Sequence, residues 1–275
     1  MKGMKIVSML AVTLVMVSAS FAAISSSGGT EDFETVGVAD EAELTNGFLT
    51  DWVITDAEAT QGIYYDTSSG GTLDTSGWSL ANGSLSKPSS TADLKANITG
   101  AGSVGVILEA PLVTGRDFVY SWWVGFQTPP SDNFRTGIGF PNLGTLGSNS
   151  VHFEFQGNGT GTKDFIWGVR KNTSGTGATV ANPYGSGATD DTDYSTLNWN
   201  KFEIRIETSS SAKGTATYTY NGTELGTCEL IQDTGTTLES HKFFVAMFKA
   251  NTSGTIYLDD LEVSSASGID DWIIF

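Results

Sequence analysis

The stretch WNKFEIRIETSSSAKGTATYTYNGTELGT, residues 199–227, carries the clearest strand and turn signals of the chain. Apolar and polar residues alternate through KFEIRIE (201–207), which predicts a β-strand with one buried and one polar face. A second alternating run, TATYTY (215–220), leads directly into Asn221-Gly222. This dipeptide supplies the positive φ angles of a type I′ turn. The stretch therefore predicts antiparallel strands joined by a tight hairpin.

The same period-two alternation recurs along the chain between turns rich in Gly, Asn and Ser. The further runs are FVYSWWVGFQ (118–127), VHFEFQ (151–156), KFFVAMF (242–248) and TIYLDDLEV (255–263). Many short alternating runs with 33 glycines between and around them are typical of an all-β sandwich or barrel. In each run the apolar set is expected to face the core and the polar set to face outward.

The N-terminus reads as a secretion signal. Lys2 and Lys5 precede an uncharged apolar run over 6–23, and small residues then offer a cleavage site. We expect residues 1–22 to be removed after Ala22, with a cut after Ala19 as an alternative and a membrane anchor as the other interpretation. Residues 23–265 would then form one β-sandwich domain that is secreted or held at the cell surface.

The net charge and the cysteine content limit the binding partners and the covalent links that the chain can have. The formal net charge is −17, so the surface is expected to repel nucleic acid and anionic lipid and to tolerate neutral glycans and cations. Cys228 is the one cysteine, so an intramolecular disulfide is excluded. Its alternating surroundings predict a small buried side chain rather than a nucleophile.

The C-terminus carries an apolar tail. Residues 266–275 end in IDDWIIF, which follows a Ser- and Gly-rich link. An exposed tail of this kind favours aggregation, so we expect it to dock on the domain or to pair with a second copy of the chain.

Polar residues of three alternating runs would lie together if their strands shared a sheet. This candidate ligand-binding face comprises Trp123, His152, Glu154, Gln156, Glu203, Arg205 and Glu207. An aromatic plane among carboxylates and amides suits a sugar ring, and two carboxylates in a cleft suit glycoside cleavage. Alternation alone also predicts a plain solvated sheet face, so that interpretation stays open.

Three segments together resemble one family. DFET (32–35), the opening stretch and GTIYLDDLEVSS (254–265) are similar to the concanavalin A-like lectin/glucanase jelly roll in its laminin-G-like branch. The resemblance implies an all-β, two-sheet antiparallel jelly-roll β-sandwich. It also implies a structural calcium that joins the first and last strands, with Glu34 and Asp259 or Asp260 as ligands.

The resemblance favours binding over catalysis. Laminarinase-type members of the family place Glu-x-Asp-x-x-Glu or Glu-x-Asp-x-Glu on one strand, whereas the corresponding strand of this chain has His152, Glu154 and Gln156. The leading hypothesis is a secreted non-catalytic domain that binds polysaccharide or glycoconjugate at the cell surface. The alternatives are a structural subunit of an extracellular filament or surface layer, which self-associates through the tail, and a polysaccharide hydrolase or lyase.

Overall fold

The computed structural model describes most of the chain between residues 24 and 266. The described ranges are 24–33, 43–44, 48–55, 61–67, 79–80, 92–98, 107–128, 134–140, 150–157, 164–171, 177–181, 198–231, 237–247 and 254–266. The expected signal segment 1–22, the calcium candidate Glu34 and the IDDWIIF tail lie outside the described residues.

One sheet, called the β13 sheet, contains nine strands. Its order is β15-β14-β13-β8-β17-β5-β3, with β1 beside β17 and β4 beside β13. Its strands are β1 (Gly29–Glu31), β3 (Gln61–Thr67), β4 (Ser79–Leu80), β5 (Ala92–Ile98), β8 (Phe118–Thr128), β13 (Asn198–Ser210), β14 (Lys213–Tyr220), β15 (Thr223–Ile231) and β17 (Gly254–Ser265).

The other sheet, called the β10 sheet, contains eight strands. Its order is β12-β11-β10-β9-β16-β6-β2, with β7 beside β16. Its strands are β2 (Val53–Thr55), β6 (Ile107–Glu109), β7 (Val113–Thr114), β9 (Phe134–Gly139), β10 (Ser150–Gly157), β11 (Asp164–Lys171), β12 (Gly177–Ala181) and β16 (Ser240–Met247).

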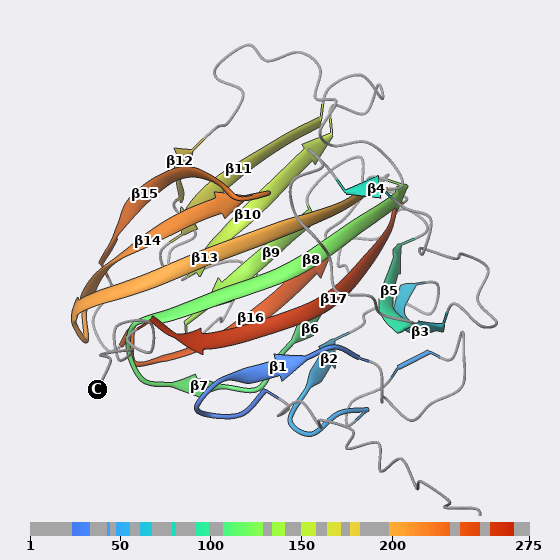
Figure 1. The fold of residues 1–275 in the computed structure, drawn as a ribbon, viewed down its shortest axis with the longest axis horizontal. Helices are drawn as coiled ribbons and strands as arrows, with labels where there is room; N and C mark the ends of the chain where they lie inside the picture. The colour runs from blue at the N-terminus through green and yellow to red at the C-terminus, as the bar shows by residue number, and fades with distance from the viewer. Residues whose placement is uncertain are drawn as a thin grey trace, which may run out of the picture.

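The two sheets lie one over the other as a sandwich (Figure 1). Every pairing is antiparallel except that of β4 with β13. The predicted all-β, two-sheet antiparallel sandwich is confirmed. Within the described ranges, no helix has the length and apolar character needed to cross a membrane.

Aromatic side chains from both sheets fill the core. Trp122 of β8 stacks on Phe202 of β13 with ring centroids 6.0 Å apart. Across the sandwich its ring meets Phe153 of β10 and Phe243 of β16 edge-on, at 6.1 Å and 5.0 Å. Burial of each large side chain contributes about 1.5–3 kcal/mol, and an aromatic contact adds about 0.5–1.5 kcal/mol. This cluster holds the sheets together.

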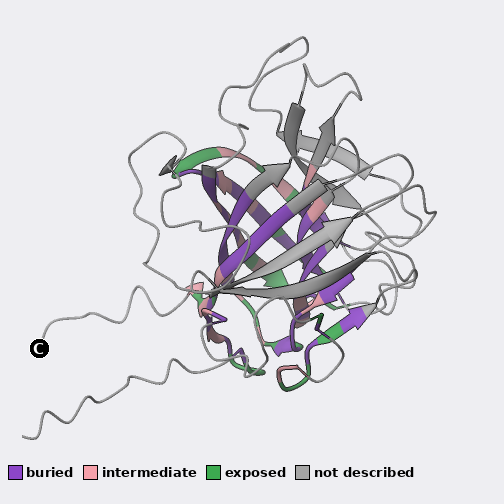
Figure 2. Ribbon diagram, turned by 90° about the vertical axis from the view of Figure 1, so that its right-hand side faces the viewer, coloured by how far each residue is buried: buried purple, intermediate pink, exposed green. Residues whose placement is uncertain are grey.

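The predicted alternation places side chains correctly on most of the core strands. Phe118, Tyr120, Trp122 and Val124 of β8 are buried in the core, as are Val151 and Phe153 of β10 and Phe202, Ile204 and Ile206 of β13. Buried residues run along the strands of both sheets (Figure 2). Cys228 is half-buried and packs against the core rather than lying within it.

The predicted hairpin turn is present between β14 and β15. Asn221 and Gly222 have φ angles of 47° and 79°, in the left-handed region. The Asn221 side chain also ties the turn to β13, because its Oδ1 accepts from the Lys201 backbone N–H at 2.8 Å and its Nδ2 donates to Asn200 Oδ1 at 3.1 Å. Tyr220 donates its hydroxyl to the same Asn200 oxygen at 2.7 Å. Asn221 therefore forms the turn and also clamps it to β13 through its side-chain hydrogen bonds.

We predict that Asn221→Gly lowers the free energy of unfolding by about 1–3 kcal/mol, because two side-chain hydrogen bonds are lost while the φ angle stays accessible. Asn221→Ala should lose about 1 kcal/mol more, since alanine resists the left-handed conformation. Urea unfolding of both variants measures the difference. Equal stability of the wild type and Asn221→Gly would show that the clamp contributes nothing.

Candidate functional site

The expected ligand-binding face is split between the two sheets. Trp123 and Glu203 lie on neighbouring strands of the β13 sheet, because β8 pairs with β13. His152 and Glu154 lie in the β10 sheet, where β10 pairs with β9 and β11. Since both sets point away from the core on opposite sides of the sandwich, the expectation of one shared face is wrong. The side chain of Gln156 lies outside the described part of β10.

Trp123 does not offer its ring to solvent. It faces outward, in register with Lys201 of β13 and Asp259 of β17, yet it is only 4% exposed. Trp199 and Tyr257 are buried as well. A sugar ring stacks on an accessible aromatic face, so in this structure Trp123 lacks the exposure that a binding platform requires.

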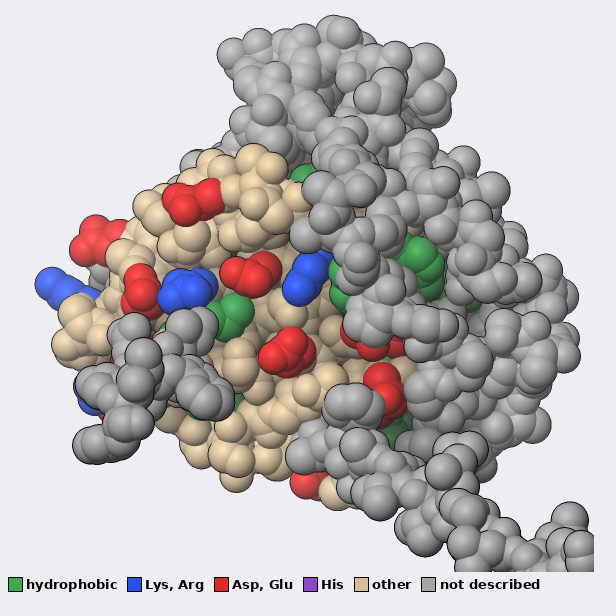
Figure 3. Space-filling model, in the orientation of Figure 1, with side chains coloured by type: hydrophobic (Ala, Val, Ile, Leu, Met, Phe, Trp, Pro, Cys, Tyr) green, Lys and Arg blue, Asp and Glu red, His purple; other side chains and the backbone are tan. Residues whose placement is uncertain are grey.

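The other candidates of the β13 sheet form a solvated face. Glu203 and Arg205 are half-buried and Glu207 is exposed. Acidic and basic side chains are interspersed on this side of the molecule (Figure 3). The alternation of charge along β13 neutralises the face locally, which is typical of a sheet surface in water.

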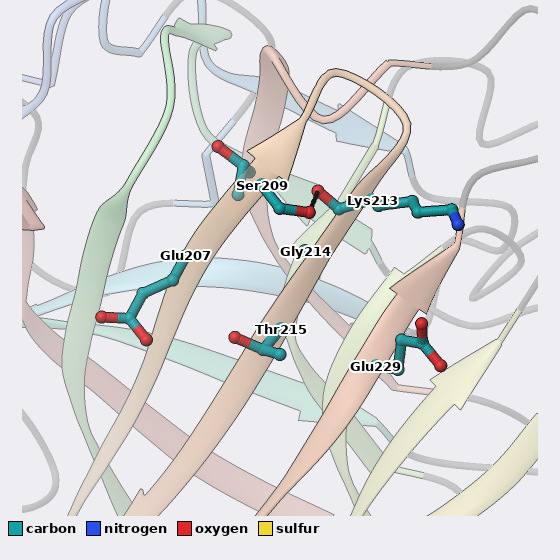
Figure 4. A pocket seen from close by; sticks show the side chains of 7 residues that line it. Glu207, Ser209, Lys213, Gly214, Thr215 and Glu229 are labelled. Carbon is teal, nitrogen blue, oxygen red and sulfur yellow. Dashed lines mark hydrogen bonds between the residues drawn. The ribbon is translucent and has the colours of Figure 1, made fainter.

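A shallow depression of about 530 Å³ is lined by residues of β13, β14 and β15. Its lining residues are Glu207, Thr208, Ser209, Lys213, Gly214, Thr215 and Glu229. In register, Thr215 lies between Glu207 and Glu229. The charged ends of Glu207, Lys213 and Glu229 spread apart rather than converge (Figure 4). The side chains that line the depression therefore do not form a focused site.

The β10 sheet carries a connected group of ionisable side chains on its outer face, called here the His152 cluster. His152 Nδ1 lies 2.9 Å from Ser150 Oγ, and His152 Nε2 lies 3.5 Å from Glu154 Oε2. Arg135 Nη2 donates to Glu154 Oε1 at 3.3 Å. His152 is fully buried, whereas the Glu154 and Arg135 side chains keep 15% and 14% exposure. The carboxylate is thus reachable from outside and lies between an imidazole and a guanidinium.

Local backbone geometry positions the imidazole. Gly137 of β9 is in register with both His152 and Phe244, and the His152 ring meets the Phe244 ring at 6.0 Å in an edge-on contact. A Cβ at position 137 would lie 2.5 Å from both His152 Cα and Val151 O. Glycine is therefore required for the close approach of β9 and β10 beneath the cluster.

A second ion pair lies on the outer face of the β10 sheet. Lys242 Nζ lies 2.6 Å from Glu109 Oε1, and both side chains are partly exposed. Phe244 is in register with Glu109, so this pair lies on the same side of the sheet as the His152 cluster. Sequence reasoning selected His152 and Glu154 but missed Arg135, Lys242 and Glu109. The alternation Arg135, Gly137, Gly139 in FRTGIG was the available signal for Arg135.

Acidic residues gather where β1 meets β17. Asp259 is fully buried and its Oδ1 accepts from the Asp260 backbone N–H at 2.8 Å, while Asp260 has a φ of 47° at a β-bulge. Burial raises the pKa of Glu31; the Phe33 N–H opposes this shift, and the charges of Asp32 and Asp259 add to it. Among the described residues, no three His, Cys, Asp or Glu side chains converge as metal ligands. These residues therefore form at most part of a calcium site.

No protein family model and no curated protein matches the chain. Solved structures with a similar fold include alginate lyase Aly36B, at 17% identity over 70% of this chain and 88% of that one, with a TM-score of 0.48. An endo-β-1,4-glucuronan lyase from the fungus Trichoderma reesei matches at 11% identity, 82% and 94% coverage and a TM-score of 0.45. A sialidase matches at 11% identity over 87% of this chain and 18% of that one, with a TM-score of 0.49. Similarity at this level assigns neither a family nor an activity.

We predict that Gly137→Ala displaces β10 and lowers the free energy of unfolding by about 2 kcal/mol or more, because backbone atoms must move to admit the methyl group. Gly214→Ala is the matched control. Gly214 lies in the β13 sheet, where a Cβ at this position would lie 2.5 Å from the Glu207 carbonyl oxygen. Both variants should lose stability in chemical unfolding, and only Gly137→Ala should shift the NMR signals of the His152 ring. Identical ring signals in both variants would contradict the positioning role.

Proposed function

We propose that the chain is a polysaccharide-cleaving protein whose active face is the outer face of the β10 sheet, with the partly exposed Glu154 as its acid–base group and the buried His152 as the residue that positions the Glu154 carboxylate. The observation that carries this proposal is the chain of contacts from His152 through Glu154 to Arg135. We further propose that the protein works outside the cytoplasm, as its N-terminal sequence predicts.

The energetic cost of the His152 cluster supports a functional role. Any exposed polar side chain can cover an outer sheet face at little energetic cost. A buried imidazole and a largely buried ion pair cost more, because they must be desolvated. Groups of titratable side chains that are buried together are enriched at active sites. An imidazole in contact with a carboxylate is also an arrangement that transfers protons.

The described side chains do not offer an aromatic platform for glycan binding. Binding of a glycan chain usually involves accessible aromatic rings, and Trp123 is buried. Among the described residues, the large hydrophobic side chains that are exposed are Val53 and Leu112, and neither is aromatic. Glycan binding without cleavage is the second candidate, because Arg135 and Glu154 also offer hydrogen bonds to hydroxyl groups.

The composition of the cluster favours elimination over hydrolysis. Hydrolysis commonly uses two carboxyl groups, and the cluster holds one. Elimination needs a base that removes a proton next to a sugar carboxylate and a cation that stabilises the resulting charge. Glu154 would take the proton, and Arg135 would face the sugar carboxylate. The glycosidic C–O bond would then break as a carbon–carbon double bond forms, and the protonated Glu154 or water would return a proton to the leaving oxygen. The proposed substrate class is therefore a uronic acid polysaccharide.

We predict that Glu154→Gln lowers cleavage about 10²–10⁴-fold, because the side chain can no longer exchange a proton. Glu203→Gln and Glu207→Gln are the matched controls on the opposite face and should retain wild-type rates. The measurement is product release from a panel of neutral and uronic polysaccharides, with unsaturated ends distinguishing elimination from hydrolysis. Binding without product release would favour the second candidate. An equal loss of activity in Glu203→Gln would contradict the proposal, because it would show that the β13 sheet carries the active face.

We also propose a structural calcium beside Asp259, as the family resemblance implies. The raised pKa of Glu31, which burial causes and neighbouring carboxylates increase, supports this proposal. A divalent cation would relieve the repulsion among these carboxylates.

We predict that millimolar calcium raises the melting temperature of the chelator-treated protein, because a ligand bound only by the folded state stabilises it. Asp259→Asn should abolish most of this increase, whereas Glu207→Gln should preserve it. Thermal unfolding with calcium and with chelator measures both effects. The same melting temperature in calcium and in chelator would rule out the structural cation.

A further inference from the structure

His241 joins the two sheets inside the core. It belongs to β16, is fully buried, and its Nδ1 lies 2.5 Å from the hydroxyl oxygen of Tyr120 in β8. The Phe118 and Tyr120 rings approach the imidazole edge-on, with centroids 4.9 Å and 5.5 Å away. Burial raises the pKa of Tyr120 well above its usual value, so its phenol stays protonated beside the imidazole.

His241 lies at a corner where two peripheral segments attach to the sandwich. β7 pairs with β16 through Val113 and His241 themselves. The Thr114 N–H donates to the Ser26 carbonyl at 2.8 Å, and the Gly115 N–H donates to the Glu239 carbonyl at 2.8 Å. We call residues 25–28, 113–117 and 238–241 the β7 corner. The corner is also tied to the β13 sheet, because the Leu238 N–H donates to the Ser211 carbonyl at 2.7 Å and the Thr208 N–H donates to Asp117 Oδ1 at 2.6 Å.

We propose that His241 is an acid-sensitive latch, whose protonation opens the β7 corner while the aromatic core of the sandwich stays folded. This inference is independent of the proposed polysaccharide cleavage. An imidazolium at this position would place an unpaired charge between aromatic rings, and opening of the corner would let water solvate it.

Among the described residues, no charged side chain of the surrounding elements contacts the imidazole. Tyr120 is the titratable side chain that contacts the imidazole among the described residues. On the adjoining segments, Arg116 pairs with Glu239 at the surface, where the two side chains are 45% and 43% exposed. Lys242 pairs with Glu109 on the outer face of the sheet. Burial is accordingly the main influence on the imidazole.

The direction of the pH effect follows from that burial. Burial lowers the pKa of His241 to about 4, with the Gly115 backbone acting in the opposite direction. An opened corner restores the ordinary value of about 6.5. The open state then binds a proton that the closed state does not, so the stability of the corner is fully present above about pH 6.5 and is lost as the pH falls toward about 4. Glu31, whose pKa is raised, has the opposite effect.

Hydrogen exchange of the full chain tests the latch. From about pH 6.5 to about pH 4.5, the opening equilibrium of the β7 corner should rise about 40-fold after correction for intrinsic exchange rates. The amides of Phe153 and Phe202 in the core should keep their protection. In His241→Gln, which retains a hydrogen-bond acceptor but does not titrate, the corner should change less than about threefold. Tyr120→Phe, which keeps the imidazole, should retain the wild-type pH dependence.

Equal pH dependence in the wild type and His241→Gln would overturn the latch. Loss of protection in the core together with the corner would overturn it as well, because the opening would then be global. Should His241→Gln fail to fold, an NMR titration of the wild type decides the question, and the chain has only two histidines to assign. Titration of the His241 ring near pH 6.5 with the corner still protected would contradict the proposal.

Discussion

The packing of Trp122 between the sheets is the contact on which the rest of the structure depends. Its ring stacks on Phe202 within its own sheet and meets Phe153 and Phe243 of the other sheet edge-on. Because successive side chains of a strand alternate, fixing Phe153 inward fixes His152 and Glu154 outward. The core therefore determines which polar side chains reach each surface, and it keeps the two outer faces apart.

This constraint makes the His152 cluster a rigid arrangement. His152 and Glu154 flank a core residue of β10, and Arg135 projects from the neighbouring strand. Side chains placed on strands hold their geometry more closely than those placed on loops, which matters for proton transfer. Gly137 contributes through its missing side chain, since it lets the neighbouring strands approach beneath the imidazole. The site is thus built from backbone geometry as much as from its reactive groups.

Local patterns predicted the fold because alternation and turn chemistry are local properties. The inward set of β13 and the Asn221-Gly222 hairpin followed from a few adjacent residues. Sheet membership did not, because the pairing of β10 with β9 and β11 depends on contacts between distant segments. The prediction of a single polar face was wrong for this reason. Alternation likewise placed Trp123 on an outer face, but exposure depends on the whole fold, and this ring is buried.

In the proposed function, the polysaccharide contacts the outer face of the β10 sheet. Backbone NMR of the protein with a short uronic acid oligosaccharide tests it directly, using the inactive Glu154→Gln variant to prevent cleavage. The amide signals that shift should belong to Arg135, Gly137, His152 and the neighbouring part of β16. Shifts gathered instead on Glu203, Arg205 and Glu207 of β13 would contradict it.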